Sequence, residues 1–269
     1  LPASLRCFYL PYDYQEFDLD YEQCRRAFYN QHPDFIYIDM SNSLFTIDLQ
    51  KLRSIAPPNT FIHYDASQIM GLLLDKDYFN PLSYECGLLA GSTHKTFPGP
   101  QHGMILSNDP ALMTRIETYT NTFVSNHHMN NVASLAMTAL EMMEFGSDYS
   151  KRIRSNAVKL GEELIERGIP VVKCSKGITC THQLWINPIG LNQEAHEIVR
   201  KLRNNNIITN CVRLPFSEDK MVKGIRLGTT EVSRLGMGAD EMKIIADLIF
   251  QTVSGADSNE KIRLDVERL

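Results

Sequence analysis

Short apolar runs alternate with a helical pattern in the first 110 residues of the chain, and this alternation limits the possible folds most. The runs are FIYIDM (35–40), FIHYD (61–65), CGLLAG (86–91) and GMIL (103–106), with a helical pattern over residues 47–55 between the first two. Strands separated by helices usually form a mainly parallel sheet covered on both faces. The sequence therefore predicts an α/β fold whose functional residues lie at the carboxyl ends of the strands.

A change of pattern follows this part of the chain. Helical patterns over residues 130–145 and 151–167 are separated by a glycine and a serine, and we expect a domain boundary at residues 146–147. The prediction is a large domain over residues 1–146 and a smaller α+β domain over residues 147–269.

The predicted small domain contains both strands and helices. Its predicted strands are VVKC (171–174), HQLWINP (182–188) and GIRLGT (224–229), and its predicted helices cover residues 193–204 and 240–253. At the two ends of the chain the patterns are weaker. We expect residues 1–20 to form a strand and a connector, and the charged tail over residues 254–269 to dock loosely.

The composition is that of a globular chain with a small, soluble partner. Apolar residues make up 43%, charged residues 22% and the net charge is -5, so there is no basic surface for nucleic acid or an anionic membrane. No apolar run approaches the ~20 residues of a membrane span, and the start lacks the layout of a signal peptide. We therefore expect a cytoplasmic location. The six cysteines occur without a CxxC pair, which indicates reduced thiols rather than a zinc site or disulfides.

A lysine stands directly after a predicted strand, in the stretch GSTHKTFPGP. Lys95 follows CGLLAGS, and Asp65 ends the preceding strand, so a parallel sheet brings both to one edge. One interpretation is a solvated surface amine. The other is a Schiff-base lysine, which condenses with an aldehyde cofactor or a carbonyl substrate. The polar neighbours Thr93, His94 and Thr96 favour the second interpretation, because they offer donors for a phosphate and groups for proton transfer.

Three separated motifs carry a resemblance to a known family. They are DASQIMGLLLD, which begins at Asp65, STHKTFPGPQHG around Lys95, and GIRLGTTEVSRLGM near the end. In this order and spacing they resemble the serine hydroxymethyltransferases, which are fold-type I enzymes that use pyridoxal 5'-phosphate (PLP). The resemblance implies the C-terminal part of the large PLP-binding domain followed by the small domain. It also implies that PLP bonds to Lys95 and that Asp65 keeps the pyridine nitrogen protonated.

The same resemblance implies roles for four further residues. Thr93 and His94 would line the cofactor pocket, with His94 near the phosphate and close to the reacting groups. Ser41 in DMSNS would lie beside the phenolic oxygen of the cofactor. Arg226 in GIRLG would clamp the α-carboxylate of the substrate, for which a planar guanidinium is well suited, although a surface arginine on a strand is the alternative.

The chain departs from the family pattern at three places. Gln68 replaces a histidine three residues after the aspartate, and an amide can hydrogen-bond the ring substituent but cannot exchange protons. Gln101 and His102 replace an arginine in the GPRGG turn. His127 and His128 replace part of a glycine-rich loop, where we expect a cofactor-phosphate or substrate contact across a subunit interface, with a metal site as the alternative. These departures weigh against folate-dependent serine–glycine interconversion and favour a transaldolase or a related aldol enzyme.

Family members have well over a hundred residues before the point at which this chain begins. That part supplies the aromatic residue stacked on PLP and some of the phosphate contacts. We therefore expect the chain to be the C-terminal portion of a split or cleaved enzyme, with a second polypeptide supplying the N-terminal half. A sheet without that half would have exposed edges. We also expect a homodimer or a higher oligomer.

The predicted function is that of a PLP-dependent transferase acting on an amino acid and a small carbonyl compound. It would make or break the Cα–Cβ bond of a β-hydroxy amino acid through a quinonoid intermediate stabilised by the protonated ring. Two alternatives stay open: an aminotransferase or another enzyme that forms a Cα carbanion, and a non-catalytic scaffold subunit. The presence of Asp65, Lys95 and Arg226 together argues against the scaffold.

Overall fold

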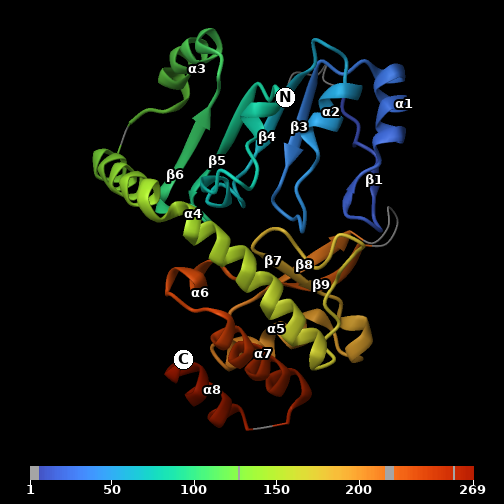
Figure 1. The fold of residues 1–269 in the computed structure, drawn as a ribbon, viewed down its shortest axis with the longest axis vertical. Coiled ribbons are helices and arrows are strands. Elements are labelled where there is room, and N and C mark those ends of the chain that lie inside the picture. The colour runs from blue at the N-terminus through green and yellow to red at the C-terminus, as the bar shows by residue number, and fades with distance from the viewer. Residues whose placement is uncertain (1–5, 127, 216–220, 257) are drawn as a thin grey trace.

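Two lobes, each with its own sheet, are joined by one long helix (Figure 1). The computed structural model describes residues 6–126, 128–215, 221–256 and 258–269. The first lobe holds a sheet in the order β3-β4-β5-β6, formed by β3 (Phe35–Asp39), β4 (Phe61–Asp65), β5 (Leu88–His94) and β6 (Pro98–Leu106). Strands β3, β4 and β5 are parallel, and β6 is antiparallel to β5. The predicted α/β fold with a mainly parallel sheet is confirmed.

Strand β6 begins earlier than the predicted start at residue 103. Its first residue, Pro98, pairs with His94, so β5 and β6 form a hairpin whose tip contains Lys95. Proline has no backbone N–H to donate, and it is tolerated here because β6 is an edge strand.

The strands show the predicted alternation of buried and exposed side chains. Along β3, Ile36 and Ile38 are buried on one face, whereas Tyr37 is exposed on the other. Helices α1 (Tyr21–Gln31) and α2 (Leu49–Ile55) add Phe28 and Leu52 to the same hydrophobic core. This core fixes one face of the sheet and leaves the other face of β3 open.

The first 31 residues contain more structure than the sequence predicted. A two-stranded hairpin, β1 (Tyr12–Asp13) and β2 (Asp18–Leu19), precedes α1, which was not predicted. Helix α1 is capped by Asp20, whose carboxylate accepts the N–H of Gln23 at 2.9 Å. Such a cap stabilises a helix by about 1 kcal/mol. The remaining elements of the first lobe are α3 (Pro110–Phe123) and two short 3-10 helices, Leu72–Leu74 and Pro81–Tyr84.

The connecting helix α4 (Met129–Glu166) is a single helix of 38 residues. The prediction of two helices, separated at residues 146–147, is wrong. Gly146 lies inside the helix because it packs closely on the first lobe: a Cβ at this position would lie 3.0 Å from the Cβ of Leu74. A glycine in the middle of a helix lowers the stability by about 1 kcal/mol relative to alanine. The close approach of Gly146 to Leu74 explains why a glycine is nevertheless present here. The proposed domain boundary therefore falls within a continuous helix.

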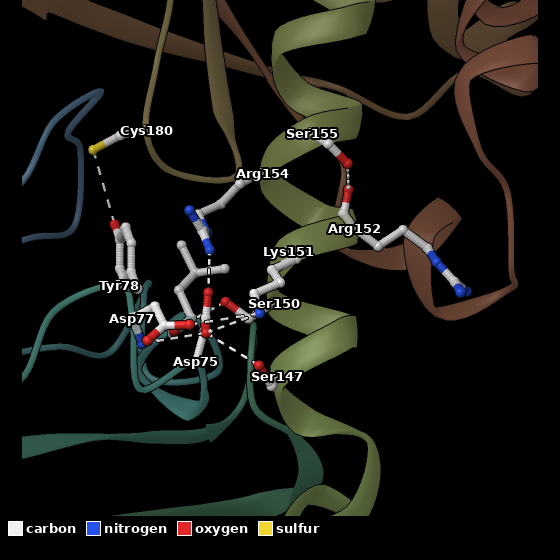
Figure 2. A network of polar contacts seen from close by, with 11 residues as sticks. Asp75, Asp77, Tyr78, Ser147, Ser150, Lys151, Arg152, Arg154, Ser155 and Cys180 are labelled. Atoms are coloured by element: carbon white, nitrogen blue, oxygen red, sulfur yellow. Dashed lines mark hydrogen bonds and ion pairs between the residues drawn. The ribbon is translucent and has the colours of Figure 1, made fainter.

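A buried carboxylate attaches the middle of α4 to the first lobe (Figure 2). Asp75 forms an ion pair with Arg154, accepts a hydrogen bond from Ser147 at 3.1 Å and lies 3.7 Å from Lys151. Burial raises the pKa of the Asp75 carboxyl, but hydrogen bonds from Asp77 N–H and Ser147 and the two cations outweigh burial and lower it. Asp75 is therefore a charged, paired carboxylate between the helix and the sheet.

Removal of the Asp75 charge should destabilise the protein strongly. Asp75→Asn leaves the partly buried Arg154 guanidinium without its counter-ion, and breaking a buried pair in this way costs about 3 kcal/mol of the free energy of unfolding. Urea denaturation measures this loss. Asp77→Asn is the matched control, because Asp77 is exposed, lies 3.8 Å from Lys151 and should change stability by less than about 0.5 kcal/mol. Equal losses in the two variants would contradict the assignment.

The second lobe is built on a three-stranded antiparallel sheet in the order β7-β9-β8. Its elements are β7 (Gln183–Ile186), β8 (Asn210–Pro215), β9 (Met221–Gly228), α5 (Ala195–Asn204), α6 (Thr230–Arg234), α7 (Ala239–Ser254), α8 (Asn259–Arg268) and a 3-10 helix, Pro188–Leu191. Asn156 of α4 donates to Ser233 Oγ and to Met237 O, both at 2.9 Å. The same helix is thus attached to both lobes.

Two predictions in the second lobe need correction, and one strand was missed. Residues 171–174 form isolated bridges at Val171 and Cys174 rather than a strand. Strand β8 was not predicted, because three of its six side chains are exposed and its sequence has no strong alternation. The C-terminal tail folds as α8 and buries Ile262 completely, so it is not loosely docked. In the described ranges, no helix combines the length and the apolar character that a membrane span requires.

Candidate active site

The carboxyl ends of the parallel strands bring the predicted acid and lysine to one edge of the sheet. Asp65 ends β4 and is paired in register with Asp39 of β3 and Ala90 of β5. Lys95 lies just beyond the end of β5, in the turn that leads into β6. Lys95 and His94 are both exposed, so their side chains are accessible from solvent.

Buried threonines hold the turn that carries Lys95. Thr93 Oγ1 donates to Pro100 O at 2.8 Å, and Thr96 Oγ1 accepts the N–H of Gly71 at 3.0 Å. Tyr149 of α4 donates to Thr96 O at 3.1 Å. Both threonines are almost fully buried. The lysine is therefore exposed on a turn whose flanking residues are fixed, and the predicted contact of Thr93 with a cofactor stays a prediction.

A glycine permits the close contact beneath this turn. A Cβ on Gly71 would lie 2.1 Å from Thr96 O, which no side chain can tolerate. The glycine in DASQIMG thus allows the segment after β4 to touch the lysine turn. This contact explains physically why two of the sequence motifs lie together.

Asp65 is held as a carboxylate by two hydrogen bonds. Tyr37 OH donates to Oδ2 at 2.6 Å, and Ser67 N donates to Oδ1 at 2.9 Å. Burial raises the pKa of the Asp65 carboxyl, but the hydrogen bonds from Ser67 and Tyr37 outweigh burial and lower it. The hydrogen bond to Asp65 raises the pKa of Tyr37 to about 12, so the phenol keeps its proton. The strand end therefore presents a fixed negative charge.

Tyr37→Phe should raise the pKa of Asp65, because the variant removes a hydrogen bond that stabilises the carboxylate. The carboxyl chemical shift of Asp65, followed by NMR as the pH is lowered, measures the change. Tyr29→Phe is the control, since Tyr29 is 79% exposed on α1 and lies away from the site. An Asp65 titration that is the same in the wild type and in Tyr37→Phe would show that this hydrogen bond does not set the charge.

Arg226 reaches the site from the second lobe. It lies on β9 and donates from Nη1 to Ser41 O at 3.3 Å, and Gln183 of β7 donates to the same carbonyl at 3.2 Å. The Ser41 N–H in turn donates to Asp39 Oδ1 at 2.7 Å. Burial lowers the pKa of Arg226, which is half-buried. Ser41 is thus where the two lobes meet, and Arg226 is positioned beside it.

His182 belongs to the site although the sequence analysis did not select it. Its side chain is buried, and among the described residues its Nδ1 atom has no hydrogen-bond partner. Burial, together with the positive charges of Arg226 and Lys95, lowers the pKa of His182 to about 3. The imidazole is therefore neutral and lies within electrostatic reach of both cations. A lone histidine at the start of an apolar strand is typical of a core residue, so its position in the sequence was only a weak indication of a functional role.

The other predicted residues have less defined surroundings. Gln68 is half-buried in the turn after β4, and Gln101 and His102 lie on β6. His128 is exposed at the start of α4, where Asn131 donates to Gln101 O at 3.3 Å. Within the described part of the chain, no hydrogen bond joins His128 to Asp65, Lys95 or Arg226. His127 lies outside the described residues, and among those described no cluster of histidine, cysteine and acidic side chains is placed to hold a metal ion.

The fold and the arrangement of this site are those of the PLP-dependent fold type I. A model of the family described as serine hydroxymethyltransferase matches residues 6–249. The chain belongs to the serine hydroxymethyltransferase family. The cofactor that this family indicates is PLP, and the chemistry of the residues fits it, because the site holds an exposed lysine amine on a fixed turn, an ionised carboxylate and a half-buried guanidinium.

Individual relatives support the same family assignment. The chain is 34% identical over 270 residues to a serine hydroxymethyltransferase of Archaeoglobus fulgidus, covering 99% of this chain and 61% of the relative. A serine hydroxymethyltransferase of Sulfolobus acidocaldarius is 36% identical over 245 residues, with coverages of 89% and 56%. The chain thus spans about 60% of the length of the curated relatives that it matches.

A solved structure shares the fold. The L-threonine transaldolase of Pseudomonas fluorescens, described in its internal aldimine state, superposes with a TM-score of 0.89 and 28% sequence identity. The match covers 97% of this chain and 60% of the transaldolase chain. The architecture of both lobes is therefore that of a fold-type I enzyme.

Proposed function

We propose that this chain carries the lysine-bearing part of a PLP-dependent transferase that makes or breaks the Cα–Cβ bond of a β-hydroxy amino acid. One geometric observation carries the proposal: Lys95 directly follows the end of β5, and Arg226 of the second lobe donates to Ser41, just beyond the end of β3 in the same sheet. The site also has an ionised Asp65 at the same sheet edge. An amine, a carboxylate and a guanidinium together are what PLP and an amino-acid substrate need.

Each of the three side chains has a separate task in the proposal. The Lys95 amine would hold the cofactor through its aldehyde carbon and would release it to the amino group of the substrate. The pKa of Asp65 is lowered, so its carboxylate stays charged. This negative charge would hold a proton on the ring nitrogen of the cofactor. Arg226 binds the α-carboxylate of the substrate and so orients the bonds at Cα. Bound PLP supplies an electron sink for the negative charge that develops at Cα.

The bond that is made or broken is Cα–Cβ in this proposal. The similarity to a protein described as an L-threonine transaldolase supports an amino-acid donor with a β-hydroxyl group and a small carbonyl acceptor. Gln68 supports the same assignment, since an amide replaces the histidine expected of a folate-dependent enzyme at this place.

We further propose that catalysis needs the part of the family's length that has no counterpart in these 269 residues, and we call that part the complementary segment. The coverage of about 60% of the relatives supports it, as do two open edges of the first sheet, at β3 and β6. Exposed apolar residues of α4, Met137, Leu140 and Met143, support assembly into a dimer or a higher oligomer.

Reconstitution tests this function. The purified chain is incubated with PLP, with and without the complementary segment of the Archaeoglobus fulgidus relative, and L-threonine is added. Release of acetaldehyde and glycine is expected only when both polypeptides are present. Conversion of an added 2-oxo acid to its amino acid would instead identify an aminotransferase. Bound PLP without turnover of either kind would contradict an enzymatic role and favour a scaffold.

A further inference from the structure

The backbone carbonyl of Ser41, just beyond β3, accepts hydrogen bonds from two side chains of the second lobe. Arg226 donates to it from Nη1 at 3.3 Å, and Gln183 donates to the same oxygen from Nε2 at 3.2 Å. A carbonyl oxygen has two lone pairs and can accept both hydrogen bonds. Because one oxygen accepts from both side chains, the Gln183 amide and the Arg226 guanidinium lie close together.

The strand register puts these two side chains on one face of the second sheet. Trp185 of β7 lies opposite Arg226 of β9, and Gln183 lies two residues before Trp185. Opposed residues of an antiparallel pair share a face, and so do residues two apart on one strand. The alternate residues Leu184 and Leu227 belong to the hydrophobic core of the second lobe. The face with Gln183, Trp185 and Arg226 is therefore the one that contacts the first lobe.

The Gln183 amide has one favourable orientation. The side chain is completely buried, and its Oε1 accepts from Trp185 Nε1 at 3.4 Å. An indole N–H can only donate and a backbone carbonyl can only accept, so a flipped amide would present the wrong group to both partners. Leaving these buried groups unpaired would be costly. Trp185 thus sets the orientation of the amide, which directs its N–H group to Ser41.

Arg226 carries a positive charge that its surroundings do not compensate. Burial alone lowers the pKa of the half-buried guanidinium, and no acidic group among the described residues raises it. In the described part of the chain, its hydrogen bond to Ser41 uses Nη1. The remaining N–H groups of the guanidinium can therefore bind an anion, and a carboxylate suits their planar geometry.

We propose that Gln183 is a positioning residue for Arg226. It holds the Ser41 carbonyl in place, so that this oxygen anchors Nη1 and the remaining N–H groups of the guanidinium stay directed toward the substrate carboxylate. This inference rests on the proposed function, in which Arg226 binds that carboxylate. It adds a neutral residue that acts only through Arg226 and that strengthens the preference of the site for a carboxylate.

A purely structural role for Gln183 is the competing explanation, because other buried hydrogen bonds also join the two lobes here. Thr179 is buried in the segment before β7, and its Oγ1 donates to Leu44 O at 3.0 Å. Thr179→Val is therefore the matched control. It removes a buried hydrogen bond between the same two segments but leaves the contacts of Ser41 O and Arg226 unchanged.

Gln183→Met tests the inference, since methionine has a similar length but no amide. The chain is assembled with the complementary segment of the Archaeoglobus fulgidus relative and loaded with PLP. Isothermal titration calorimetry then measures the affinities for glycine and for glycinamide, which lacks the carboxylate. We expect Gln183→Met to bind glycine about tenfold more weakly than the wild type and glycinamide within about twofold. Thr179→Val should bind both ligands within about twofold of the wild type.

Gln183→Glu tests the same inference through charge and preserves the length of the side chain. A carboxylate so close to Arg226 would pair with the guanidinium and compete with the carboxylate of the ligand. We therefore expect this variant to lose the preference for glycine over glycinamide. A preference equal to that of the wild type would show that residue 183 does not act on Arg226.

The single tryptophan of the chain gives a readout that needs no ligand. When the chain alone is labelled with ¹⁵N, the indole N–H of Trp185 gives one NMR signal. The loss of its hydrogen bond to Gln183 should move this signal upfield in Gln183→Met, whereas Thr179→Val should leave it in place. A sharp signal at the wild-type position in Gln183→Met would overturn the fixed orientation of the amide.

The possible outcomes separate this inference from the proposed function. If Gln183→Met and Thr179→Val lost affinity for glycine equally, or if Gln183→Met lost none, Gln183 would have only a structural role. Either result would overturn the inference but leave Arg226 as the carboxylate site. A wild type that does not prefer glycine to glycinamide would overturn the role of Arg226 and, with it, both proposals.

Discussion

Lys95→Ala should abolish the covalent attachment of PLP. The side chain is the exposed amine on the turn fixed by Thr93 and Thr96, and no other group at this position can replace it as a nucleophile. The chain, assembled with the complementary segment, is treated with PLP and borohydride, and the attached residue is identified by peptide mass spectrometry. In the wild type the label should be found on Lys95, and in the variant it should be lost.

A distant lysine provides the control for this experiment. Lys243 is exposed on α7, so Lys243→Ala should keep the label and the turnover of L-threonine unchanged. A label that persists in Lys95→Ala at the same stoichiometry would identify a different lysine as the cofactor-binding residue. The mass-spectrometric readout does not depend on activity.

Asp65→Asn should separate cofactor binding from catalysis. Asparagine has nearly the same shape, and its single amide oxygen can still accept one of the two hydrogen bonds from Tyr37 and Ser67, but it carries no charge to hold a proton on the ring nitrogen. The PLP label on Lys95 should therefore be retained, while the turnover of L-threonine falls by about 10²- to 10³-fold. Steady-state release of acetaldehyde measures the fall.

The matched control for this variant is Asp240→Asn. Asp240 is an exposed aspartate in the first turn of α7, so its replacement should leave turnover within about twofold of the wild type. If turnover in Asp65→Asn stayed within the same range, the assigned role of the Asp65 charge would be wrong.

The sheet of the first lobe was predictable because its strands are short apolar runs bounded by polar residues. The same runs located Asp65 and Lys95 at strand ends, since parallel strands bring their carboxyl ends to one edge. Periodicity also gave α5 and α7, whose apolar positions recur at helical spacing. In these elements the residues that the sequence pattern marks as apolar are the ones that are buried in the structure.

Elements with little apolar content were missed. Helix α1 has a charged and polar sequence with three buried residues, and the Asp20 cap marks its start more clearly than its periodicity does. Strand β8 exposes three of its six side chains and buries only Leu214, so its sequence shows no alternation of apolar and polar residues. Gly146 was interpreted as a break, although close packing on Leu74 accounts for a glycine within a continuous helix.

The contacts that tune the site depend on tertiary structure and could not be read from one sequence. Tyr37 and Asp65 are 28 positions apart and meet only because β3 and β4 pair in register. His182 and Ser41 approach Lys95 and Arg226 only when the lobes are in place. Sequence reasoning selected the charged residues and several neutral ones, whereas Tyr37 and His182, which lie beside the charged groups, belong to none of the motifs.

The continuity of α4 makes the active site sensitive to the exact number of residues in that helix. Asp75 fixes the helix to the first lobe at Arg154, and the contacts of Asn156 fix it to the second lobe. One residue added to an α-helix turns everything beyond it by about 100° and moves it by about 1.5 Å. A residue inserted or deleted at Ser155, between these two attachment points, would therefore rotate and shift the contacts of Asn156 relative to those of Arg154, and the two lobes could not keep both sets of contacts.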